Sequence, residues 1–180
     1  MKSVLISIRP KWCEKIASGD KTIEVRKTRP KLDTPFKCYI YCTQSGVALG
    51  ALGKHGKVIG EFTCDRIFEI GKRGIPENFD YCYLSLNEWG NDDIETEIKA
   101  ISASCVSKEK LNAYGAKAPF LYGWHISDLK IYDKPRELDW IRKPLECHRG
   151  NDRENCVGCW DCEIKRPPQS WCYVEGSDAK

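Results

Sequence analysis

The N-terminal part of the chain changes from a strand-like to a helix-like hydrophobic pattern and back again. Residues 3–8 alternate toward apolar side chains, which predicts a β-strand. Across residues 10–19 the apolar positions recur at helical spacing, with a proline suited to the first turn and a glycine suited to the end. Residues 21–27 predict a second strand, in which Glu24 and Arg26 occupy the polar face while the intervening apolar side chains face the core.

The rest of the pattern consists of short strands without the regular strand–helix alternation of a parallel sheet. Strands are predicted at residues 36–42, along a stretch at 57–70 that bends near position 64, as one or two strands at 121–132, and at 170–175. Ser107 is expected to cap a short helix that runs to Tyr114. Five or more strands with two or three short helices predict an α+β fold, specifically a mixed β-barrel.

Composition places the chain among ordinary globular proteins. Apolar residues make up 41% and charged residues 31% of its 180 residues, and no apolar run is long enough to cross a membrane or form a signal peptide. Eleven cysteines are many, but the odd number and the absence of an export signal favour reduced thiols or a metal site over a disulfide framework. We therefore expect a cytoplasmic protein that has no membrane partner.

Positive charge is concentrated near the N-terminus. Residues 9–37 hold nine Lys and Arg against four Asp and Glu, a net +5, whereas the whole chain carries only +3. A local excess of this kind suits a polyanionic partner such as nucleic acid, and it is equally typical of a solvated basic surface.

The segment at 134–168 differs from the rest, with little periodicity, four prolines and four cysteines. It has too few apolar side chains to order itself, so we expect a metal or a cross-link to do so. We thus divide the chain into a barrel at residues 1–133, a cysteine-rich appendix at 134–168, and a last strand with its tail at 169–180.

The cysteines of this appendix have the spacing of zinc ligands. Cys156, Cys159 and Cys162 form two overlapping CxxC steps, which can wrap around one tetrahedral Zn²⁺ ion of structural type. The fourth ligand is expected to be Cys147, with His148 and then Cys172 as alternatives. Free or redox-active thiols and an iron–sulfur cluster are the other interpretations.

Three sequence stretches carry a resemblance to a known family. Residues 19–26 read GDKTIEVR, and their Gly, Lys, Glu and Arg match in order and spacing the Gly-x-Lys-x-x-Glu-x-Arg signature of the ASCH family, part of the PUA-like superfamily. Residues 121–127 (LYGWHIS) and 166–174 (RPPQSWCYV) resemble the central and terminal strands of its phage and prophage branch. The matched signature positions are Gly19, Lys21, Glu24 and Arg26.

The resemblance implies a PUA-like barrel with a basic cleft beside the first helix that binds RNA, a nucleotide or a modified nucleoside. The residues agree with this, because Glu24 and Arg26 lie two positions apart on one strand face, about 6–7 Å from each other, and Lys21 can reach the same opening. Trp124 and Trp171 are candidate stacking surfaces for an unpaired base, although both are also suited to the core. A surface ion network that ties helix to strand is the alternative for the three charged residues.

Two other functions remain open from the sequence. One branch of the family comprises amidohydrolases acting on acylated cytidines, which use a Lys and a Thr of this motif; here Lys21 is kept but Glu24 stands in place of the Thr. Glu24 would then act as a general base on water, with Lys21 beside it, instead of as a nucleophile. The third hypothesis is a protein-interaction adaptor that works through its zinc knuckle.

Overall fold

The computed structural model describes residues 2–44, 55–73, 80–83, 102–116, 118–144 and 163–175. The chain divides into two compact units, each assembled from separate stretches of sequence. The first unit comprises Met1–Cys13, Phe36–Phe62 and Leu129–Lys180, and the second comprises Glu14–Pro35 and Thr63–Asp128. In the part of the chain that the structure describes, no helix has the length and hydrophobicity needed to cross a bilayer.

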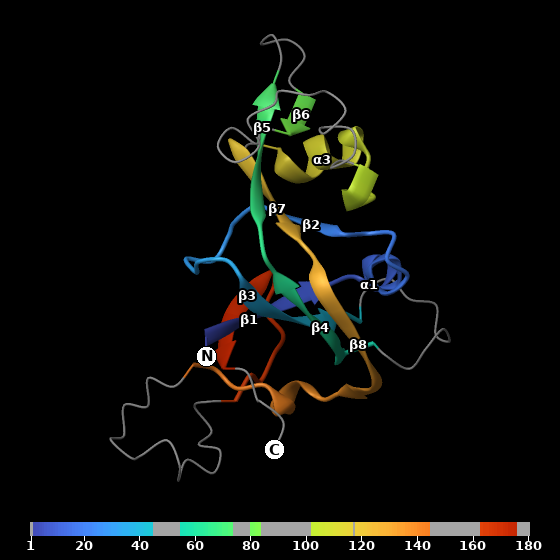
Figure 1. Ribbon diagram of the computed structural model, residues 1–180, viewed down its shortest axis with the longest axis vertical. Helices are drawn as coiled ribbons and strands as arrows, with labels where there is room; N and C mark the ends of the chain where they lie inside the picture. The colour runs from blue at the N-terminus through green and yellow to red at the C-terminus, as the bar shows by residue number, and fades with distance from the viewer. Residues whose placement is uncertain are drawn as a thin grey trace. The chain divides into compact units, whose positions relative to one another are not determined.

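A five-stranded mixed sheet forms the first unit (Figure 1). Its strands lie in the order β8 (Ser127–Arg136), β4 (Lys57–Cys64), β3 (Phe36–Cys42), β1 (Lys2–Ile8) and β9 (Trp171–Glu175). The strand β1 runs parallel to β3 and antiparallel to β9. Both ends of the predicted appendix join the core of this sheet, because Ile141, after the short 3-10 helix Leu138–Trp140, and Ile164 are buried against Leu5 and Tyr39.

The second unit contains a four-stranded antiparallel sheet (Figure 1). Its order is β2 (Ile23–Arg26), β7 (Phe120–His125), β5 (Ile67–Arg73) and β6 (Asp80–Tyr83). Helix α3 (Lys108–Gly115) begins at Ser107, whose hydroxyl accepts a hydrogen bond from the amide of Lys110. The core on one face of this sheet consists of Ile23, Val25, Ile70, Leu111 and Leu121, so α3 contributes to it through Leu111.

Helix α1 (Pro10–Ala17) precedes β2 and ends as the sequence predicts. Gly19 has φ +82° and donates its amide to the carbonyl of Ile16 at 3.0 Å. A left-handed residue directly after a helix favours glycine, which has no Cβ to clash. This turn places Lys21 at the entrance of β2.

The α+β class, the first strand, α1 and the Ser107-capped helix are confirmed, but the barrel is wrong. Among the described residues neither sheet closes on itself: the first ends at β8 and β9, and the second ends at β2 and β6. The single bent strand predicted at 57–70 is in fact two strands, because the chain leaves β4 at Cys64 and resumes as β5 in the other sheet. β4 and β5 therefore have different neighbouring strands, although they are adjacent in sequence.

Candidate functional site

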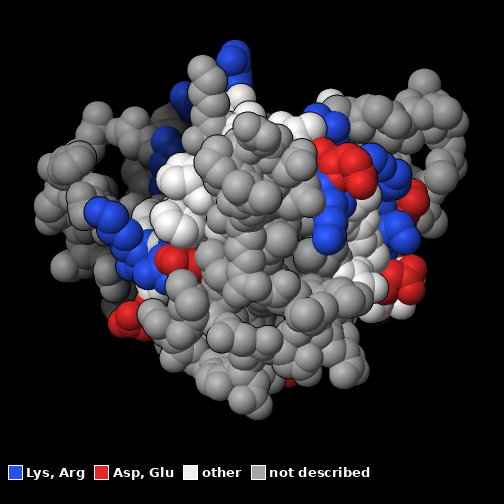
Figure 2. Space-filling model, turned by 90° about the horizontal axis from the view of Figure 1, so that it is seen from above, with Lys and Arg blue, Asp and Glu red and all other residues white. Residues whose placement is uncertain are grey.

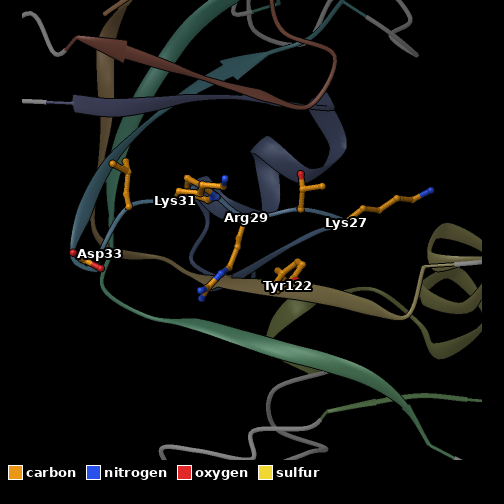
Figure 3. Close-up of a pocket in the computed structure, with 8 residues that line it drawn as sticks. Lys27, Arg29, Lys31, Asp33 and Tyr122 are labelled. Carbon is orange, nitrogen blue, oxygen red and sulfur yellow. The ribbon is translucent and has the colours of Figure 1, made fainter.

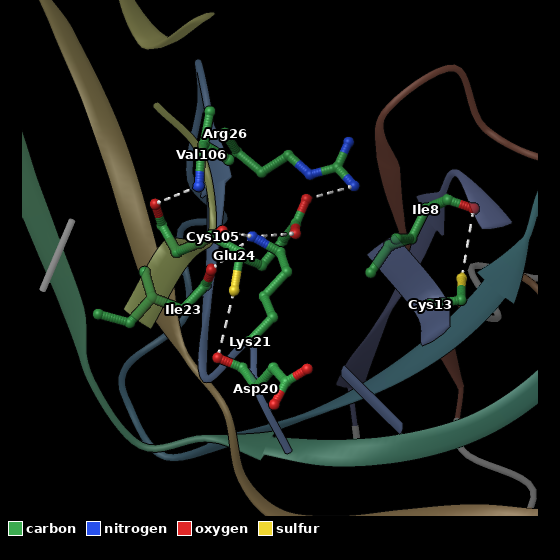
Figure 4. Close-up of polar contacts among 10 residues, drawn as sticks. Ile8, Cys13, Asp20, Lys21, Ile23, Glu24, Arg26, Cys105 and Val106 are labelled. Carbon is green, nitrogen blue, oxygen red and sulfur yellow. Dashed lines mark hydrogen bonds and ion pairs between the residues drawn. The ribbon is translucent and has the colours of Figure 1, made fainter. Parts of the chain in front are cut away.

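The three charged residues of the signature motif meet in one ion network of the second unit (Figure 4). The Nζ of Lys21 donates to the carbonyls of Ile23 and Ser104, each at 2.7 Å, and lies 3.3 Å from Oε2 of Glu24. The Nη2 of Arg26 lies 3.0 Å from Oε1 of the same carboxylate. Glu24 therefore has one cation against each of its oxygens.

This network is buried, which corrects the expectation of a polar, solvent-facing side of β2. Lys21 is 2%, Glu24 6% and Arg26 8% exposed, and all four residues of the strand are buried. Burial of charge is tolerated where each charge is paired and hydrogen-bonded, as it is here. The bonds from Lys21 to Ser104 and from the amide of Thr22 to the carbonyl of Ala103 hold the start of β2 to residues 103–104.

Aromatic side chains of β7 share the sheet face of this network. Glu24 is directly opposite Trp124 and Arg26 is directly opposite Tyr122, and residues paired in this way project to the same side. Trp124 is completely buried, Tyr122 is half-buried, and Phe120, two residues further along the same strand, is 42% exposed. The row thus becomes more accessible with distance from Trp124.

A pocket of about 600 Å³ opens where the chain leaves β2 (Figure 3). Its wall is the loop at residues 27–33 together with Tyr122, and the loop contributes Lys27, Arg29 and Lys31 against the single carboxylate of Asp33. Lys27 points away from Arg29 and Lys31 in Figure 3, and its Nζ lies 5.0 Å from the centre of the Tyr114 ring. The pocket therefore has a net positive lining and one aromatic wall.

Sequence reasoning missed this pocket, although a signal for it was present. Three cations alternate with other residues at positions 27, 29 and 31 inside the basic stretch at 9–37. On the face drawn in Figure 2, Lys and Arg side chains lie beside Asp and Glu side chains, so charges of both signs are mixed on that face. The charge of the stretch alone does not predict that Tyr122, from another strand, lies beside these cations.

Tyr114 of α3 lies close to both the network and the pocket. It is 40% exposed, and burial of its hydroxyl raises the pKa of the phenol, which the nearby Glu24 raises further and Arg26 lowers. The phenol is consequently protonated at neutral pH and can donate a hydrogen bond at this edge of β2.

The remaining predicted residues are distributed elsewhere. Trp171 belongs to β9 of the first unit, where its ring lies edge-on to Tyr173 with centroids 5.4 Å apart, whereas Lys21 and Glu24 belong to the second unit. The Nδ1 of His125, next to Trp124 in β7, lies 2.7 Å from Oδ1 of Asp65. Cys13, Cys38 and Cys64 are buried, and a buried free cysteine packs as a small apolar residue.

The predicted zinc ligands Cys147, Cys156, Cys159 and Cys162 and the alternative His148 lie outside the described residues. Cys172 is described: it is half-buried in β9, and burial raises the pKa of its thiol. Across the described ranges, no group of three Cys, His, Asp or Glu side chains is arranged to hold a metal ion.

Comparison with known proteins shows likeness in fold without likeness in sequence. No family model matches the chain, and no curated protein matches it. Among solved structures it is similar to the ASCH protein from Zymomonas mobilis, with TM-score 0.56 and 18% identity over 96% of this chain and 87% of that one. A tyrosine-to-phenylalanine mutant of that protein gives TM-score 0.55 and 19% identity over 97% and 91% of the two chains, and a serine-to-alanine mutant gives 0.55 and 18% over 96% and 88%. The chain thus has the fold of an ASCH domain.

Proposed function

We propose that this chain is an ASCH-family protein that binds RNA or a modified nucleotide through the pocket at residues 27–33. The observation that carries the proposal is the combination of Arg29 and Lys31 with the aromatic wall of Tyr122 around one space of about 600 Å³. Cations hold phosphate and aromatic rings stack on bases, and single-strand binders combine the two. The ASCH fold and the GDKTIEVR motif support the same assignment.

In this proposal Lys21, Glu24 and Arg26 form the inner frame of the site. Arg26 is the member nearest the pocket, because Lys27 follows it in the chain and Tyr122 lies opposite it in the sheet. Both oxygens of Glu24 lie against cations, an arrangement that suits a fixed frame better than a general base that must hold water. We therefore favour binding over hydrolysis of an acylated cytidine.

The decisive experiment measures binding of a fluorescently labelled single-stranded RNA by anisotropy at low salt. The variant Arg29→Ala/Lys31→Ala should bind at least about tenfold more weakly, and the slope of affinity against salt should fall by about two, one for each lost phosphate contact. The matched control is Lys130→Ala/Lys134→Ala, which removes the same charge from two exposed positions of the first unit. Equal losses in both variants, or no binding by the wild type across RNAs and modified nucleosides, would refute the proposal.

For the C-terminal segment we propose a structural zinc site formed by Cys147, Cys156, Cys159 and Cys162. Structural zinc contributes on the order of 10 kcal/mol to the folding of small domains. Protein purified without added metal should contain about one zinc per chain by elemental analysis. Cys159→Ser should lose that zinc and gain protease sensitivity between residues 145 and 162, whereas Cys38→Ser, a change outside the segment, should retain the metal. Metal-free wild-type protein with a protease-resistant segment would contradict this site, and with it the adaptor hypothesis.

A further inference from the structure

We infer that the site accepts at least two consecutive nucleotides of a single strand, with one base on Tyr122 and the next on Phe120; this inference rests on the proposed function and specifies its ligand. Its basis is the row of aromatic side chains along β7, of which only the end at Phe120 is open. The expected ligand is therefore a single-stranded oligonucleotide and not an isolated nucleoside.

The spacing of the row suits successive bases. Tyr122 and Phe120 are two residues apart on one strand, so their side chains project to the same face about 7 Å apart. Phe120 is directly opposite Gly71 in β5, so its neighbour in the sheet places no side chain beside the ring. Leu121, between the two, is fully buried in the core on the opposite face, which shows that the two aromatic rings point away from that core.

The exposure of Phe120 alone does not indicate a binding position, because single exposed apolar residues are normal on protein surfaces. Its position on the strand does indicate one. It continues, on the same strand and the same face, the line that begins at buried Trp124 and passes through Tyr122 at the pocket wall. Phe120 is therefore the place where a second base would lie if a first base occupied the pocket.

Charged residues on either side of the aromatic row would orient a bound nucleic-acid strand. Tyr122 has Arg26 of β2 on one side and Glu69 of β5 on the other. Phosphates are attracted to the β2 side, where Arg29 and Lys31 line the pocket, and are repelled from the exposed carboxylate of Glu69. The amino groups of bases are the ligand atoms that Glu69 can accept.

The test compares adenosine 5′-monophosphate, its 5′-phosphorylated dinucleotide, and the same dinucleotide with an abasic second position, all by calorimetry at one salt concentration. A second stacked base should tighten binding roughly 5- to 150-fold. The abasic compound should lose that gain, although it keeps both phosphates. Phe120→Ala should bind the dinucleotide no better than the abasic compound while its affinity for the mononucleotide is unchanged, and Phe120→Trp should restore the gain.

The control variant is Tyr173→Ala, which removes a half-buried aromatic side chain from β9 of the first unit and leaves β7 unchanged. It should leave the gain from the second base intact. Equal affinity for dinucleotide and abasic compound in the wild type, or a Phe120→Ala variant that keeps the gain, would overturn the inference while leaving the proposed function in place. Failure of every compound to bind would overturn the proposed function and the inference together.

Discussion

Two neighbouring stretches of the second unit use the same kinds of charged residue in opposite ways. In residues 21–26 the charged side chains of Lys21, Glu24 and Arg26 are at most 8% exposed, and each forms an ion pair with another of the three. In residues 27–33 Arg29 and Lys31 line an open pocket. Charged residue types therefore do not distinguish a buried structural network from the exposed lining of a pocket, whereas the burial of the side chains does.

The largest difference in stability between the two stretches is expected when the charge at the centre of the network, that of Glu24, is removed. Glu24→Gln keeps the shape of the side chain but leaves Lys21 and Arg26 buried without their counter-ion, which should lower the free energy of unfolding by about 3–5 kcal/mol. Urea denaturation followed by tryptophan fluorescence measures this. The matched change Asp33→Asn, at the exposed pocket carboxylate, should alter stability by less than about 0.5 kcal/mol. Similar values for the two variants would show that the network is not a structural element.

A double-mutant cycle measures the interaction energy between Lys21 and Glu24 separately from their other contacts. Lys21→Met removes the cation while keeping most of the side-chain volume. The double variant Lys21→Met/Glu24→Gln should be less destabilised than the sum of the single variants, with a coupling of about 0.5–3 kcal/mol, since the two groups are 3.3 Å apart. Urea denaturation of all four proteins gives the coupling, and a value near zero would mean that the hydrogen bonds from Lys21 to the two carbonyls account for its burial.

The smallest effect is expected at the pocket. Arg29→Ala/Lys31→Ala should change the free energy of unfolding by no more than about 0.5 kcal/mol per position, because neither side chain is buried in a core. Thermal unfolding of the variant beside the wild type measures this. A clear loss of stability would mean that Arg29 and Lys31 stabilise the fold, as Lys21 does. Weaker RNA binding by this variant would then not distinguish a lost contact from a destabilised protein.

Local patterns in the sequence predicted most of the elements. Periodicity and capping residues identify β1, α1 and α3, because those signals lie within ten residues of one another. The spacing of the signature motif also predicted correctly that Lys21, Glu24 and Arg26 would meet. Their burial was not predictable, since the acceptor that completes Lys21 is the carbonyl of Ser104, 83 positions away.

The aromatic row and the pocket required knowledge of strand pairing. Tyr122 belongs to the site only because β7 pairs with β2 in a register that sets it opposite Arg26. The barrel prediction failed for a related reason: a strand pattern shows that residues 57–70 are extended, but not that β4 and β5 take different neighbours. Register and sheet membership are set by contacts between distant segments.

The pairing of β1 with β9 determines how the first unit would respond to mechanical force. Lys2 lies directly opposite Glu175, and the two strands run antiparallel, so the start of β1 and the end of β9 lie side by side in the sheet. Tension applied at these two residues would load the hydrogen bonds between the strands one at a time, beginning with the outermost, because these bonds are perpendicular to the strands. Strands β1 and β9 would therefore separate one hydrogen bond at a time under small forces. Tension applied along β1 and β9 in opposite directions would instead load all the hydrogen bonds between them at once, in shear.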